Sequence, residues 1–125
     1  MIDLIPLKDV YSIYQLGANQ AIPSRIFDSG FYSITRTDDE VSIVTNCKPV
    51  LENIKCSRYW KGFKVDGILD FSLVGILNDI TKPLKDNNIS VFVISTFNTD
   101  YIFVKEESFA GAIAIFAATK DINVK

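Results

Sequence analysis

The sequence of 125 residues contains no histidine. Histidine is the commonest general base and metal ligand, and Ser–His and Cys–His nucleophilic pairs require it. Cys47 and Cys56 alone do not complete a zinc-ligand set of the usual kinds. Gly62 and Gly67 lie near the end of an expected strand, but their spacing fits neither nucleotide-binding fingerprint. A lysine- or carboxylate-based enzyme is still open on these grounds, but we expect a protein that is not an enzyme and that holds no metal and no cofactor.

Long apolar runs are also missing. No apolar stretch approaches the roughly 20 residues that a membrane-spanning helix needs. The opening residues, 1–6, lack the basic start and the apolar centre of a secretory signal peptide. We therefore expect a cytoplasmic protein with no membrane association, whose two cysteines are free thiols.

The charge balance argues against nucleic-acid binding. There are 13 basic and 15 acidic residues, so the sequence predicts no positively charged surface for phosphates. Lys61-Gly62-Phe63 resembles the start of an RNA-recognition signature, but the residues that follow, 64–66, break it. The acidic run at 38–40 is interpreted as a solvated turn in preference to a cation site.

The sequence predicts a hairpin near the end of the chain, and its pattern is repeated earlier in the chain. The apolar runs Ile89–Ile94 and Tyr101–Val104 flank a polar segment, which is typical of a β-hairpin. A weaker copy lies sixty positions earlier. In it, Tyr32, Ile34, Thr35, Asp38, Glu40 and Val44 correspond to Phe92, Ile94, Ser95, Asn98, Asp100 and Val104. A recurring hairpin indicates two copies of one small module.

The second copy predicts a complete module. We expect a strand over Lys61–Asp66, a helix over Leu73–Lys85 capped by Asp70 or Ser72, the hairpin, a helix over Ser108–Ala118 and a strand over Ile122–Val124. Pro83 should kink or end the first helix in its last turn. The order β-α-β-β-α-β is that of a ferredoxin-like module.

The first copy predicts a shorter module. Tyr11–Leu16 should be a strand, Phe31–Thr37 and Val41–Asn46 a hairpin, and Val50–Lys55 a helix of at most two turns. The expected fold class is α+β, with two fused βαββαβ modules over residues 1–60 and 61–125. Their antiparallel sheet should carry helices on one face.

Both alternating sets of residues in the second hairpin are apolar. Ile89, Val91 and Val93 fall on one face of the strand, and Phe92 and Ile94 fall on the other. A sheet covered by helices on one face only should alternate apolar with polar residues. We therefore expect association through the second module, most simply as a homodimer.

Three segments of the second half resemble the ACT domain. They are Gly67-Ile-Leu-Asp-Phe-Ser, the helix beginning Leu73-Val-Gly-Ile-Leu, and the hairpin string Ile-Ser-Thr-Phe-Asn-x-Asp at 94–100. The similarity is clearest over Lys61–Glu107, and Phe31–Val44 fits a weaker first module. The resembling subgroup comprises tandem ACT modules related to the cytosolic arginine sensor and to the regulatory part of aspartokinase.

The resemblance implies a regulatory protein that binds an amino acid or similar zwitterion between ACT modules. It places the ligand against the loop residues Gly67, Ile68, Leu69 and Asp70 and the hairpin residues Ser95, Thr96, Phe97, Asn98 and Asp100. Asp100 suits an ammonium or guanidinium group, with Phe97 as an apolar wall. The alternative for Asp100 is a turn carboxylate that bonds its own backbone.

Two function classes remain open from the sequence. The first is a non-catalytic regulatory module that passes its signal to a separate protein partner. The second is a structural or interaction subunit of the same fold that has lost its ligand. A thermal-shift screen with amino acids distinguishes the two, because a ligand that binds only the native state raises the melting temperature.

Overall fold

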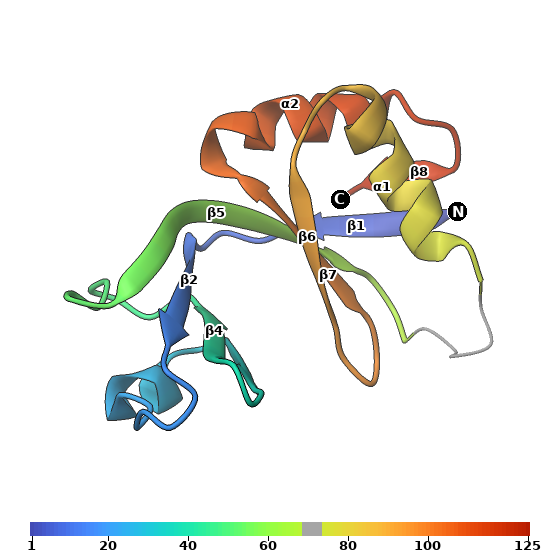
Figure 1. Ribbon diagram of the computed structural model, residues 1–125. Helices are drawn as coiled ribbons and strands as arrows, with labels where there is room; N and C mark the ends of the chain where they lie inside the picture. The colour runs from blue at the N-terminus through green and yellow to red at the C-terminus, as the bar shows by residue number, and fades with distance from the viewer. Residues whose placement is uncertain (69–73) are drawn as a thin grey trace. The chain divides into compact units, whose positions relative to one another are not determined.

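The computed structural model describes residues 1–68 and 74–125, which form two compact units (Figure 1). The helical unit comprises Met1–Lys8 and Lys61–Lys125, and the strand unit comprises Asp9–Trp60. The expected first module, residues 1–60, therefore differs from the observed strand unit by its first eight residues.

The helical unit contains a five-stranded sheet in the order β6-β7-β5-β1-β8. The strands are β1 (Ile2–Pro6), the end of β5 (Lys55–Val65), β6 (Val91–Ser95), β7 (Asp100–Lys105) and β8 (Ile122–Val124). β1 pairs antiparallel with β5 and parallel with β8. The expectation of an entirely antiparallel sheet is wrong, because β1 lies between two strands that a simple βαββαβ module would place side by side.

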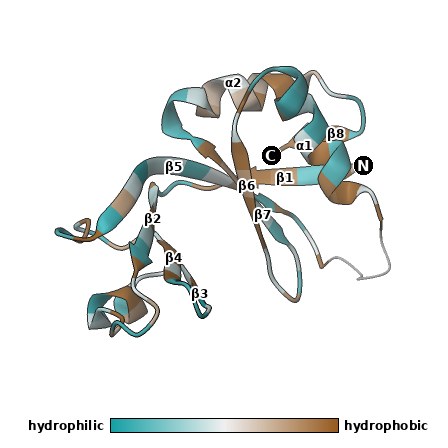
Figure 2. Ribbon diagram, viewed as in Figure 1, coloured by the Kyte–Doolittle hydropathy of each residue, from teal (hydrophilic) through white to brown (hydrophobic). Residues whose placement is uncertain are grey.

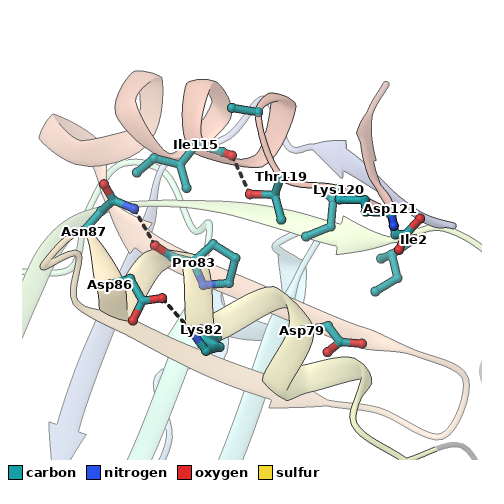
Figure 3. A pocket seen from close by; sticks show the side chains of 12 residues that line it. Ile2, Asp79, Lys82, Pro83, Asp86, Asn87, Ile115, Thr119, Lys120 and Asp121 are labelled. Carbon is teal, nitrogen blue, oxygen red and sulfur yellow. Dashed lines mark hydrogen bonds and ion pairs between the residues drawn. The ribbon is translucent and has the colours of Figure 1, made fainter.

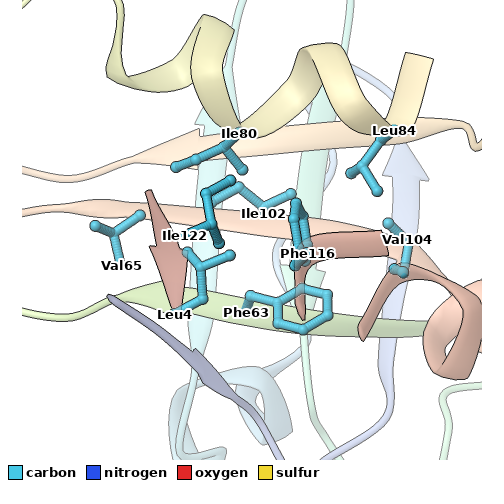
Figure 4. Packing of buried hydrophobic residues seen from close by; sticks show 10 residues of the cluster. Leu4, Phe63, Val65, Ile80, Leu84, Ile102, Val104, Phe116 and Ile122 are labelled. Atoms are coloured by element: carbon cyan, nitrogen blue, oxygen red, sulfur yellow. The ribbon is translucent and has the colours of Figure 1, made fainter. Parts of the chain in front are cut away.

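Two helices cover one face of this sheet (Figures 1 and 4). They are α1 (Ile76–Asp86) and α2 (Glu106–Ala117). Their core-facing residues Ile80, Leu84, Ala112 and Phe116 pack on Leu4, Phe63, Val65, Ile102, Val104 and Ile122 of the strands. Figure 2 shows β1 and β6 as largely hydrophobic. Burying each large apolar side chain contributes roughly 1.5–3 kcal/mol, so this cluster is a main source of stability.

The start of α1 differs from the prediction. The helix begins at Ile76 after Gly75, which has a φ of 81° and no capping side-chain bond. Val74 is not helical, and Leu73, Asp70 and Ser72 lie outside the described residues. Pro83 lies in the last turn of α1, which ends at Asp86. Helix α2 begins two residues before its expected start and ends one residue before its expected end.

The strand unit contains β2 (Tyr11–Leu16), a 3₁₀ turn (Ser24–Asp28), β3 (Tyr32–Arg36), β4 (Val41–Thr45) and the start of β5. These strands are antiparallel in the order β3-β4-β2-β5, and the predicted first hairpin is present. The core of the unit comprises Tyr14, Leu16, Ile26, Val41, Ile43, Cys47 and Leu51.

The helix expected over Val50–Lys55 is wrong. Residues 9–60, all of which the structure describes, form no α-helix, and Lys55 begins β5. Side chains from elsewhere in the unit instead bond the backbone at the start of this segment and directly before it. The Leu51 amide donates to the Tyr14 hydroxyl at 2.9 Å, and Arg25 donates to the Pro49 carbonyl. This unit therefore does not have the βαββαβ order.

Candidate functional site

The predicted site consists of a loop after β5 and the turn of the β6–β7 hairpin. In the loop, Gly67 has a φ of 92°, a conformation that glycine adopts without strain. Ile68 is 80% exposed. Leu69 and Asp70 lie outside the described residues. The sequence predicts that this loop leads directly into a helix, but α1 begins only at Ile76.

The hairpin turn is well defined. Ser95 and Asp100 are opposite each other at the end of the β6–β7 ladder. Between them, the Thr96 amide donates to the Thr99 carbonyl at 2.8 Å, and the Thr99 amide donates to the Thr96 hydroxyl at 3.3 Å. Phe97, at the tip, is 80% exposed, and Asn98 is also exposed. Four of the predicted residues therefore form one short, outward-facing turn.

A buried hydroxyl joins this turn to the end of β5. The Thr99 side chain, which is 4% exposed, donates to the Val65 carbonyl at 2.8 Å. Val65 stands two residues before Gly67, so the loop and the turn leave the sheet at the same end. The predicted motif left Thr99 as a variable position. No local pattern indicates this role, because the acceptor lies 34 residues earlier in the chain.

Asp100 faces the helical side of the sheet. It alternates with Ile102 and Val104, both of which reach the helical core. Its side chain is half-buried. No ion pair within the described residues includes it. A carboxylate in this position is available to a cationic group.

A second charged group lies at the same end of the sheet. Lys125 donates to the Asp66 carboxylate, next to Gly67. That hydrogen bond, together with the charge of Lys125, lowers the pKa of Asp66 and raises the pKa of Lys125. Asp66 is therefore already paired, which leaves Asp100 as the better candidate for a ligand contact.

A hollow of about 640 Å³ lies elsewhere in the helical unit, between α1 and the turn from α2 to β8 (Figure 3). Its lining does not include any predicted site residue. Lys82 pairs with Asp86 at 2.7 Å, and Asn87 and Thr119, which follow α1 and α2, donate to the carbonyls of Pro83 and Ile115 in the last turns of those helices. These polar groups stabilise helix ends, and sequence periodicity gives no signal for such a hollow.

The described residues contain no group of three or more histidine, cysteine, aspartate or glutamate side chains arranged for a metal ion. Both cysteines are free, and Cys47 is buried beside Arg25. Among the described helices, none has the length and apolarity to cross a membrane.

The second half of the chain matches a family model. The model for the ACT domain covers residues 55–118. A separate model, described as an N-terminal domain, covers residues 9–52. The division between the two matches falls close to the division between the strand unit and the helical unit.

Solved structures agree with the family match. A protein from Agobacterium tumefaciens is 34% identical, over 99% of this chain and 92% of that chain, with a TM-score of 0.90. The ligand-free regulatory subunit of aspartate kinase from Thermus thermophilus is 10% identical, over 94% of this chain and 97% of that chain, with a TM-score of 0.62. Aspartate kinase from Clostridium acetobutylicum is 15% identical, over 90% of this chain and 34% of that chain, with a TM-score of 0.64. At these low identities, the two kinase structures share the fold alone. The match to the ACT model over half of the sequence nevertheless shows that this chain belongs to the ACT domain family.

Proposed function

We propose that this protein is a non-catalytic regulatory module that binds an amino acid or a similar zwitterion at the hairpin end of the helical unit. The observation that carries the proposal is the Thr99–Val65 hydrogen bond of 2.8 Å, which holds the hairpin turn beside the strand leading into Gly67. The half-buried Asp100 carboxylate lies at the base of that turn.

The chemistry of these residues suits a zwitterion. Asp100 supplies an acceptor for an ammonium or guanidinium group, and hydrogen bonds between charged groups are stronger than neutral ones. The Gly67 amide already bonds the Asp66 carboxylate, so we propose that the exposed backbone at Ile68 faces the carboxylate of the ligand. Phe97 supplies an apolar wall, as small-molecule sites usually require.

The high exposure of Phe97 and Ile68 supports an interface site. Each is 80% exposed, so a ligand between them would remain largely in solvent unless another surface covered it. We propose that a second copy of the chain provides that cover in a homodimer. Light scattering that gave the mass of one chain, with and without ligand, would contradict the dimer.

The second candidate is an interaction subunit that does not bind a ligand. The same two exposed apolar side chains favour it, because they could contact a protein partner directly. In either case the protein would act on a separate partner.

A thermal-shift screen separates the two candidates. Each of the twenty L-amino acids is added singly to the wild-type protein at a concentration well above the expected Kd. At a concentration 100 times Kd, a native-state ligand adds about 2.7 kcal/mol to the free energy of unfolding, which raises the melting temperature by several degrees. The N-acetyl and carboxamide forms of each active amino acid serve as controls, since each lacks one charge. A screen with no active amino acid would favour the interaction subunit.

A further inference from the structure

The two hydrogen-bonding functions of Thr99 are separate. Its main chain closes the hairpin turn, because its carbonyl accepts from the Thr96 amide at 2.8 Å and its amide donates to the Thr96 hydroxyl at 3.3 Å. Its side-chain hydroxyl does not bond within the turn and instead donates to Val65. The turn can therefore close without this hydroxyl, which ties the turn itself to the end of β5 in addition to the pairing of β7 with β5.

The acceptor of this bond, the Val65 carbonyl, belongs to the last residue of β5. Val65 ends β5 and is 2% exposed, so its carbonyl requires a partner within the protein. The next amide, that of Asp66, donates instead to Asp3 in β1 at 2.8 Å. Gly67 then turns away with its positive φ. The two residues before Gly67 are thus held by a bond to the hairpin at Val65 and by a bond to β1 at Asp66.

We infer that Thr99 is the positioning residue of the proposed amino-acid site, because its buried hydroxyl fixes the hairpin turn relative to the Gly67 loop. This inference rests on the proposed function. Thr99 is 4% exposed and its hydroxyl donates to the Val65 carbonyl, so the hydroxyl does not itself face a ligand. Its role is to hold the turn that carries Phe97 and Asp100 at a fixed separation from Gly67.

Two substitutions at the same position test the inference. Thr99→Val keeps the shape of the side chain and removes the hydroxyl, whereas Thr99→Ser keeps the hydroxyl. Thr81→Val is the matched control, since it removes a hydroxyl that donates to Leu77 within α1 at 2.8 Å, away from the site. The three variants are compared with wild type by calorimetric titration with the amino acid that gives the largest thermal shift. Amide hydrogen exchange of Gly67, Ile68, Phe97 and Asn98 is measured without ligand.

The positioning role predicts a specific pattern. Thr99→Val should weaken amino-acid binding about tenfold, the loss expected for one hydrogen bond, and should speed exchange in both the loop and the turn. Thr99→Ser should restore affinity to within about threefold of wild type, and Thr81→Val should leave affinity unchanged even if its melting temperature falls.

Several results would overturn the inference. If Thr99→Val binds as tightly as wild type, or if exchange rises in the turn but not at Gly67 and Ile68, the hydroxyl does not position the site, while the proposed function stands. If no amino acid binds the wild-type protein, the proposed function fails, and with it the assigned role of Thr99.

Discussion

Gly62 lies directly against the ring of Phe103. A Cβ added to Gly62 would stand 2.8 Å from two ring carbons, a separation at which the two groups overlap. Phe103 is fully buried and stacks on Phe92, with the ring centres 4.8 Å apart. The ring therefore occupies a fixed position, and the close approach of β5 to β7 requires glycine.

Gly62→Ala should lower the free energy of unfolding by about 1–3 kcal/mol, because the overpacked site must shift backbone or rings. Gly111→Ala in α2 is the matched control, because a Cβ there meets nothing within 4 Å. Replacing an exposed helical glycine with alanine should raise the free energy of unfolding by roughly 0.5–1 kcal/mol. Urea denaturation of both variants checks the opposite signs. Equal destabilisation of the two would contradict the packing explanation.

Tyr14→Phe should destabilise the strand unit by about 1–3 kcal/mol at neutral pH, because the buried Leu51 amide loses its acceptor. Burial also raises the pKa of Tyr14 above its ordinary value of 10.0. Folding therefore favours the protonated phenol, and wild type should lose stability as the pH rises above 10 through the folded-state pKa. Chemical denaturation at a series of alkaline pH values should show a shallower decline in Tyr14→Phe. Parallel declines would show that Tyr14 does not contribute to the alkaline transition.

Lys125→Met should raise the pKa of Asp66 towards its ordinary value of 3.8, since the hydrogen bond and charge of Lys125 lower it. The Asp66 contribution to stability is present above that ordinary value and is lost as the pH falls through the lower folded-state pKa. NMR titration of the Asp66 side chain between pH 2 and 6 measures the shift directly. Lys120→Met is a suitable control. Lys120 has the same charge as Lys125 and lies just before β8, whereas Lys125 lies just after it. An unchanged pKa in Lys125→Met would exclude the ion pair in solution.

Local patterns predicted most of the helical unit. The hairpin over β6 and β7 and the core-facing stripes of α1 and α2 follow from residue spacing alone. The position of β1 does not follow from residue spacing, because Leu4 pairs with Val65 and Ile2 pairs with Ile122. No periodicity within Ile2–Pro6 encodes partners so distant along the chain.

For the strand unit and the site, sequence-based prediction was limited by side-chain bonds to distant parts of the backbone. An apolar–polar pattern over 50–55 is compatible with a short helix, but the Leu51 amide of that segment donates to the Tyr14 hydroxyl, and Arg25 donates to the carbonyl of Pro49 directly before it. Similarly, the hairpin string identified the outward-facing residues but not Thr99, whose hydroxyl points inward to Val65. Long-range side-chain bonds to the backbone leave no local sequence pattern.

The central claim is that Asp100 holds the cationic group of an amino acid. Calorimetric titration of wild type and Asp100→Asn with the most active amino acid tests it most directly. Asp39→Asn, which removes the same charge from the exposed turn of the other hairpin, is the control. The account predicts a loss of about 1.5–3 kcal/mol of binding free energy in Asp100→Asn alone, with little change in melting temperature, because asparagine keeps the shape and the acceptor oxygen of aspartate and removes only its charge. Unchanged affinity in Asp100→Asn, together with a large fall in melting temperature, would contradict it and make Asp100 a structural turn residue.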